Sequence, residues 1–239
     1  MQALMLAAGM GKRLDTQINK CMVQVANKSL FEHAVNAIKN AGISKLIVVT
    51  GYNADKLESF ILQHSVGMQV VFVRNEDYHV TNNIWSLYLA HEYFSLDDTV
   101  LLESDLIFDE MCIRELMVLQ HPNVAVVAKY ESWMDGTTVI LNKNSIQKFV
   151  SKQEFQHEDF DVSYKTVNIY KFSKEFIRGI YVPALYAHIE KNGKNHYYEM
   201  VLRELVQSEN VHIYPSIIQD RWFEIDTAED LIIARKLFY

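Results

Sequence analysis

The sequence predicts an α/β protein with a mixed, mostly parallel central sheet, and two observations support this prediction. Five short runs of apolar and β-branched residues each have the length of a buried strand. They are residues 2–7, 45–50, 68–73, 99–104 and 124–129. Between them lie stretches with helical spacing at residues 29–42, 54–64 and 82–94. Strands and helices in alternation predict right-handed crossovers, flanking helices and parallel strands.

The first predicted helix carries the clearest end signals. Ser29 stands at its capping position, Glu32 completes a capping box, and Gly42 terminates the helix. In an open parallel sheet, ligands bind beyond the carboxyl ends of the strands. We therefore expect the segments that follow the first three strands to share one crevice. They are residues 8–13, 51–53 and 74–82.

The pattern changes in the second half of the chain. Antiparallel strands are expected at residues 137–143, 146–152 and 164–173, followed by helices near 174–192 and 196–208. At the end of the chain, Asp226 or Thr227 can cap a last helix, because Glu229 and Asp230 then fall in its first turn.

Composition excludes several classes of protein. The chain has 239 residues, of which 49% are hydrophobic, and its net charge of -7 argues against a nucleic-acid surface. No stretch approaches the roughly 18 to 20 apolar residues of a membrane span. The apolar run at residues 3–8 is too short for a signal-peptide core. Cys21 and Cys112 form neither a metal motif nor a disulfide framework. We therefore expect a cytoplasmic protein with no nucleic-acid or membrane partner.

A glycine-rich loop, LAAGMGKRL, follows the first strand. Glycines at this place let backbone N–H groups approach phosphate oxygens, and Lys12, Arg13 and Lys20 can neutralise the phosphate charge. The alternative is a plain strand-to-helix turn with solvated cations. The spacing fits neither the dinucleotide GxGxxG motif, because residue 14 is Leu, nor a Walker loop.

The pattern LAAGxGxRL, with Lys20 seven residues beyond Arg13, resembles the signature of the nucleotidyltransferase superfamily. The resemblance implies a Rossmann-like fold with a small antiparallel and helical substrate lobe. It also implies that the loop wraps a nucleoside triphosphate and that Lys20 contacts the phosphates at the reacting centre. Asn19 stands where the family usually has proline. The residues assigned to the nucleotide in this part of the chain are Ala7, Ala8, Gly9, Gly11, Lys12, Arg13, Lys20 and Gly51.

Two aspartates follow apolar stretches at distant points of the chain. Taken alone, Asp105 reads as a strand-end turn residue and Asp226 as a helix cap. The resembling family holds Mg²⁺ with one Asp after its fourth strand and another late in the chain, which implies that these two residues are the metal ligands. Two carboxylates suffice, because Mg²⁺ keeps several waters and binds substrate phosphates. Glu103 and Glu224 each precede one of these aspartates by two residues and face the same side of the strand.

The expected chemistry needs positioning and charge stabilisation more than a nucleophilic side chain. The sequence accordingly shows no convincing Ser/His/Asp or Cys/His arrangement. We expect a phosphate or phosphonate oxygen of the acceptor to attack the α-phosphorus of the nucleotide. Lys20 and Mg²⁺ offset the developing charge and Arg13 holds the pyrophosphate. The catalytic group is therefore expected to be Lys20, Arg13, Asp105 and Asp226.

The segment TNNIWSLYL indicates the nucleotide. Its candidate contacts are Thr81, Asn82, Asn83 and Ser86, since amides both donate and accept hydrogen bonds as a pyrimidine edge requires. A plain helix cap is the alternative. The run resembles the bacterial phosphocholine cytidylyltransferases and their phosphonate-using relatives, which implies CTP as a substrate.

The acceptor is predicted from charged and aromatic residues of the second half. Acidic and aromatic side chains can hold an amine through charge and cation–π contacts, and lysines can hold its phosphate. The candidates are Lys129, Glu131, Trp133, Asp135, Lys165, Tyr197 and Glu199. Packing is the alternative role for the aromatic residues. Phosphocholine, phosphoethanolamine and 2-aminoethylphosphonate are the expected acceptors.

Together these features predict a Mg²⁺-dependent cytidylyltransferase. One alternative is a sugar- or polyol-phosphate nucleotidyltransferase, and another is a non-catalytic nucleotide-sensing domain of the same fold. We expect a single domain over residues 1–239, with a nucleotide-binding core (1–130), a substrate-side lobe (131–215), and a returning strand and helix (216–239). The chain ends soon after its last predicted helix, which leaves room for fusion to another enzyme domain.

Overall fold

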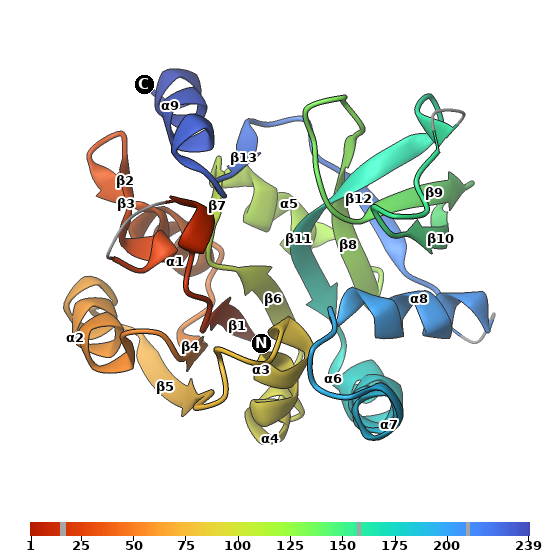
Figure 1. Ribbon diagram of the computed structural model, residues 1–239, viewed down its shortest axis with the longest axis horizontal. Helices are drawn as coiled ribbons and strands as arrows, with labels where there is room; N and C mark the ends of the chain where they lie inside the picture. The colour runs from red at the N-terminus through yellow and green to blue at the C-terminus, as the bar shows by residue number, and fades with distance from the viewer. Residues whose placement is uncertain (15–17, 157–158, 209–210) are drawn as a thin grey trace.

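The computed structural model of the chain describes residues 1–14, 18–156, 159–208 and 211–239. Among these residues, nine strands form one sheet around which the helices are arranged (Figure 1). The strands are β1 (Gln2–Ala7), β4 (Lys45–Thr50), β5 (Gln69–Arg74), β6 (Thr99–Glu103), β8 (Asn123–Lys129), β9 (Thr138–Asn142), β10 (Ser145–Val150), β11 (Ser163–Phe172) and β12 (Tyr214–Ile217). The main path runs β10-β9-β11-β6-β1-β4-β5, and β8 lies between β11 and β12.

Most strands of this sheet run in one direction, which confirms the predicted fold class. Strands β6, β1, β4 and β5 pair in parallel, as alternating strands and helices require. Of the nine described strands in this sheet, only β10 and β11 run the opposite way. Because β11 lies between β6 and β8, one continuous sheet joins the predicted core to the predicted lobe. The division into three parts stays a prediction.

The helices largely follow the predicted ranges. They are α1 (Leu30–Asn40), α2 (Ala54–His64), α3 (Asn83–Leu89), α4 (His91–Phe94), α5 (Met111–Val118), α6 (Lys174–Phe176), the π-helical turn η4 (Ile177–Tyr181), α7 (Val182–Asn192), α8 (Glu199–Gln207) and α9 (Ala228–Leu237). The capping box of α1 is present, with Ser29 and Glu32 bonded reciprocally. The predicted helix at 82–94 is two helices, α3 and α4, divided at Ala90. No helix of the described ranges is both long and apolar enough to cross a membrane.

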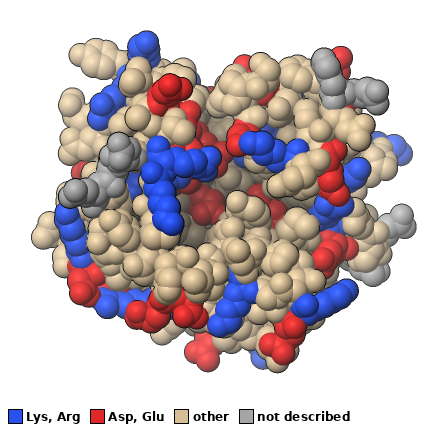
Figure 2. All heavy atoms as spheres, in the orientation of Figure 1, with Lys and Arg blue, Asp and Glu red and all other residues tan. Residues whose placement is uncertain are grey.

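The end of the chain returns to the carboxyl edge of the parallel strands. Strand β13 (Trp222–Glu224) pairs antiparallel with β7 (Leu106–Phe108), and the Ile225 N–H donates to the Asp105 carbonyl at 2.9 Å. Thr227, the second of the two predicted caps, closes a capping box with Asp230 at the start of α9. Helix α9 then lies beside the ribbon of β2 (Gln24–Val25) and β3 (Lys28–Ser29), although the two are far apart in sequence (Figure 1). The face of the molecule that Figure 2 shows is hollowed, and basic and acidic side chains gather around the hollow.

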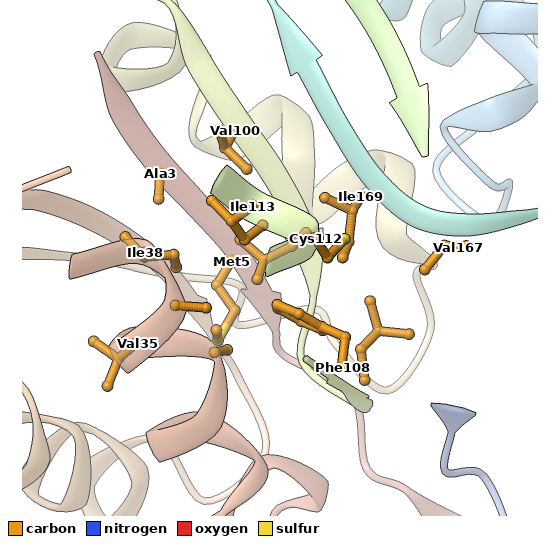
Figure 3. Close-up of a cluster of buried hydrophobic side chains, with 14 of the residues drawn as sticks. Ala3, Met5, Val35, Ile38, Val100, Phe108, Cys112, Ile113, Val167 and Ile169 are labelled. Carbon is orange, nitrogen blue, oxygen red and sulfur yellow. The ribbon is translucent and has the colours of Figure 1, made fainter. Parts of the chain in front are cut away.

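The core occupies both faces of the sheet. Successive residues of β1 point to opposite faces, so that Ala3 and Met5 join one cluster while Leu4 and Leu6 join the other. Figure 3 shows the first cluster, where Met5 meets side chains of α1 and α5. Helices α3, α7 and α8 cover the second. With both faces covered, the carboxyl ends of the strands remain open for a site.

Candidate active site

The hollow in Figure 2 consists of two adjoining cavities. One, of about 470 Å³, is lined by the glycine loop and the start of α3, and is called the loop cavity below. The other, of about 760 Å³, is lined by many carboxylates and is called the carboxylate cavity. Five residues line both: Arg13, Lys20, Asn83, Glu103 and Asp105. Of the three segments predicted to share a crevice, residues 8–13 and 74–82 contribute to the loop cavity, whereas none of residues 51–53 lines it.

Glycines let the loop pack against the lysine that follows it. Gly11 has φ +58°, and a Cβ there would lie 2.8 Å from Cγ of Lys20. A Cβ on Gly51 would lie 2.8 Å from the carbonyl oxygen of Ala8, so Gly51 backs the loop instead of lining the cavity. The Asn19 side chain donates to the Tyr52 carbonyl at 2.7 Å, which ties the segment before Lys20 to the β4 loop. Asn19, which stands where the family usually has proline, therefore fixes the position of the segment before Lys20.

The charged centre lies where the two cavities meet. The Lys20 ammonium donates to Asp105 Oδ2 at 3.1 Å and to Asp226 Oδ1. Arg13 Nη2 lies 2.9 Å from the other oxygen of Asp226. Burial by itself would lower the pKa of Lys20, but the two aspartates outweigh that effect and raise it above its ordinary value. The structure therefore brings all four predicted catalytic residues together, with Lys20 charged.

The two aspartates offer a donor set that fits Mg²⁺. The described residues contain no group of three or more His, Cys, Asp or Glu side chains arranged to hold a metal ion. Magnesium does not need one, because one or two carboxylates with waters and phosphates complete its shell. Asp105 Oδ1 is buried and has no hydrogen-bond partner in the described structure. An unpaired buried carboxylate oxygen is costly unless a ligand satisfies it.

Neutral polar side chains form the far wall of the loop cavity. Asn75 donates to both Thr81 Oγ1 and Ser86 Oγ at 3.0 Å. Asn82 caps α3 by accepting from the Asn83 N–H. The predicted residues Thr81, Asn82, Asn83 and Ser86 all line this cavity. Asn75 and Tyr78 also line it and were missed, because nothing in the sequence distinguishes them from other loop residues.

A buried lysine and several carboxylates line the second cavity. Lys165 is 3% exposed; its ammonium donates to the Thr166 carbonyl at 2.7 Å and lies 3.3 Å from Glu224 Oε2. Burial raises the pKa of Glu224 to about 7, and it also raises the pKa values of Glu103 and Glu199. The predicted residues Asp135, Lys165, Tyr197 and Glu199 line this cavity. Lys152 and Arg203 line it as well, and no sequence signal marked them.

Three predicted acceptor residues lie elsewhere. Lys129, Glu131 and Trp133 are not among the residues that line the two cavities. Lys129 donates to the Asp161 carbonyl and lies over the ring of Tyr164, whose centroid is 5.0 Å away. Trp133 stacks on Phe223 at 4.9 Å and donates to Glu131 at 2.9 Å. Trp133 therefore makes the packing contacts that were the alternative to a role in amine binding.

Comparisons with known proteins identify a family and several relatives that this chain resembles. A family model described as a MobA-like NTP transferase domain matches residues 3–209. A CTP:phosphoglutamine cytidylyltransferase of Campylobacter jejuni is 26% identical over 97% of this chain and 98% of its own length. A CMP-5'-(3-aminopropyl)phosphonate synthase of Streptomyces rubellomurinus is 24% identical over 96% of this chain, which spans 37% of that relative.

Solved structures share the fold. A CTP:phosphocholine cytidylyltransferase of Streptococcus pneumoniae superposes with a TM-score of 0.79 at 18% identity, covering 100% of this chain and 99% of the other. A UDP-glucose pyrophosphorylase complexed with UDP-glucose gives 0.82 at 16% identity, covering 100% and 98%. The predicted fold is confirmed, and it is shared by proteins whose acceptors differ.

Proposed function

The chain belongs to the MobA-like NTP transferase family, and from that premise we propose that it joins the cytidylyl group of CTP to a small acceptor. The acceptor carries a phosphate or phosphonate and an amine, and the reaction releases pyrophosphate. The observation that carries this proposal is the position of Lys20, which lies between Asp105 and Asp226 where the two cavities meet. A reacting phosphorus at that point is accessible from both sides.

The chemistry follows from that position. The loop cavity takes the triphosphate, with backbone N–H groups of the glycine loop and Arg13 toward its oxygens. An acceptor oxygen, entering from the carboxylate cavity, forms a new bond to the α-phosphorus while the bond to the bridging pyrophosphate oxygen breaks. Lys20 offsets the charge that builds up in the transition state. No side chain has to remove a proton, because the attacking oxygen is already ionised near neutral pH.

Asp105 and Asp226 are the residues that would hold Mg²⁺. When bound, the ion supplies positive charge to the phosphates and orients them. The unpaired Asp105 Oδ1 supports this assignment. Lys20 stays within reach of the same phosphates because its stem is packed against Gly11.

The choice of CTP is supported by the names of the relatives and by the amide-rich wall of the loop cavity. Asn82 and Ser86 present groups that both donate and accept hydrogen bonds, as a cytosine edge requires. The hydrogen bonds from Asn75 hold this wall in one arrangement.

The carboxylate cavity supports an acceptor with a positive charge. Glu199, which is buried, and Glu224, which is half-buried, line it, and an ammonium group beside them would favour their charged forms and be attracted by them. Lys165, among them, suits the phosphate of the same acceptor. Phosphocholine, phosphoethanolamine and 2-aminoethylphosphonate fit this description. Phosphoglutamine, the substrate in the name of the Campylobacter relative, adds a carboxylate that Lys152 or Arg203 could contact.

Pyrophosphate release tests the proposal. Each of CTP, UTP, GTP, ATP and dTTP is combined with these four acceptors and several sugar 1-phosphates, with Mg²⁺ and with excess EDTA. We expect release only with CTP and one of the amines, and none with EDTA. Release with a sugar 1-phosphate instead would favour the sugar nucleotidyltransferase alternative. CTP binding without release for any acceptor would favour the nucleotide-sensing alternative.

A further inference from the structure

Asn83, the first residue of α3, lines both cavities, and both ends of its amide are bonded within the protein. Its Nδ2 donates to Glu103 Oε1 at 3.1 Å, and its Oδ1 accepts from the Tyr198 N–H at 3.0 Å. Glu103 ends β6 in the core of the sheet, whereas Tyr198 lies 115 residues after Asn83 in the chain. Asn83 therefore links two distant parts of the site.

The segment 194–199 lies along the start of α3 through further bonds. The Asn82 N–H donates to the Lys194 carbonyl at 3.1 Å, and the Ile84 N–H donates to the His196 carbonyl at 3.2 Å. The Lys194 ammonium lies 3.8 Å from the ring centroid of Trp85. Because the first N–H groups of a helix lack partners within it, these carbonyls satisfy groups that would otherwise be unpaired. The two segments thus form one bonded unit.

The same segment builds a wall of the carboxylate cavity. Asn195, His196, Tyr197 and Glu199 all line it. Asn82, in contrast, lines the loop cavity only. The start of α3 therefore faces the loop cavity on one side and carries the wall of the carboxylate cavity on the other.

We propose that Asn83 is a positioning residue that couples the two cavities: it holds the segment 194–199 and Glu103 in register, so that a nucleotide in the loop cavity strengthens acceptor binding in the other. This inference rests on the proposed function and gives Asn83 a different role from the direct nucleotide contact predicted from the sequence. Coupling of this kind is reciprocal, so a bound acceptor strengthens CTP binding by the same factor.

The first test separates the two Michaelis constants. N83A removes both bonds, and we expect the acceptor KM to rise about ten-fold while the KM for CTP at low acceptor concentration changes less than about two-fold. S173A is the control, because Ser173 caps α6 and lines neither cavity. It should lower the melting temperature and leave both constants unchanged. Equal rises of both constants in N83A would overturn the proposal.

A role exchange tests the bond between Asn83 and Glu103. N83D alone sets two carboxylates side by side and loses the donor, so the acceptor KM should rise about ten-fold, as expected for a lost bond to a charged group. In N83D/E103Q the amide and the carboxylate have exchanged places, and the introduced carboxylate can still accept from the Tyr198 N–H. We expect the acceptor KM to return to within about three-fold of wild type. A double variant no better than N83D would overturn the proposal.

Amide hydrogen exchange gives a readout that needs no turnover. In the wild type the Tyr198 N–H is bonded to Asn83, so N83A should speed its exchange about ten-fold or more. Unchanged exchange would overturn the link even if the enzyme were active. If no acceptor supports pyrophosphate release, the proposed function fails, and this exchange rate still decides whether Asn83 holds the segment.

Discussion

The loop cavity and the carboxylate cavity are built by different means. The first is lined by the glycine loop, by short neutral side chains and by charged residues that it shares with the second, and Gly11 packs against Lys20. The second has more charged side chains in its lining, among them Lys165 of β11, Glu199 and Arg203 of α8, and Glu224 of β13, together with neutral residues of the connecting loops. Backbone N–H groups can bind any polyphosphate, whereas a particular set of charged side chains can be complementary to one acceptor. Solved structures named for different substrates share the fold of this chain.

The largest effect is expected at the centre that both cavities share. K20M should reduce kcat about 10³-fold, because it removes a charged donor at the reacting phosphorus. It also leaves Asp105 and Asp226 without their common partner, so the fold is checked by circular dichroism and thermal melting. K39M is the matched control, since the Lys39 ammonium donates to the Val66 carbonyl away from both cavities. A loss of less than ten-fold in K20M would place the reacting centre elsewhere.

A second variant disturbs only the loop side. G11A forces a Cβ to within 2.8 Å of Lys20 Cγ, and we expect kcat/KM for CTP to fall about 10²-fold through displacement of the lysine. G42A is the control: Gly42 has φ +84° with no atom within 4 Å of the added Cβ. Both variants should lose about 1–2 kcal/mol of unfolding free energy through the left-handed backbone. Equal activity in the two variants would show that crowding of Lys20 is unimportant.

A third variant disturbs only the carboxylate side. E199Q keeps the shape of the buried side chain, which accepts from the Tyr170 hydroxyl at 3.4 Å, but removes its charge. We expect the acceptor KM to rise about ten-fold, as it does when a hydrogen bond to a charged group is lost. The KM for CTP should stay within about two-fold of the wild-type value. W133F tests whether Trp133, which lines neither cavity, contributes to acceptor binding, and it should leave both constants unchanged. The assignment of acceptor binding to the carboxylate cavity would be refuted if steady-state kinetics showed a larger rise in acceptor KM for W133F than for E199Q.

The smallest effect is expected at the rim of the carboxylate cavity. Two hydrogen bonds from Arg203 hold the pKa of Glu154 down at about 2. Because this pKa lies below the value of about 4.3 in an unfolded chain, the pair stabilises the fold above that pH and loses its effect as the pH falls toward 2. Glu154 is exposed and water screens the pair, so E154Q should lower the melting temperature at pH 7 only slightly. Melting curves of E154Q and wild type should converge between pH 4.3 and 2; a constant difference would contradict this assignment.

Sequence patterns alone located one side of the site better than the other. The glycine loop, Lys20, and the run from Thr81 to Ser86 are local motifs, and the structure places them as expected around one cavity. The acceptor residues were inferred from composition, and Lys129, Glu131 and Trp133 lie outside both cavities. Trp133 stacks on Phe223, which lies much later in the chain, so no local sequence pattern predicts this contact.

By itself, the sequence determined the α/β class, the parallel strands, the helix caps and the phosphate-type loop, because each depends on residues close together in the chain. Only the tertiary structure decided which side chains meet. The pairing of β13 with β7 brings Asp226 beside Asp105 and Lys20, and the segment 194–199 reaches Glu103 through Asn83. Periods of 2 and 3.6 residues specify which face of a strand or helix is buried, but they carry no information on its partner a hundred residues away.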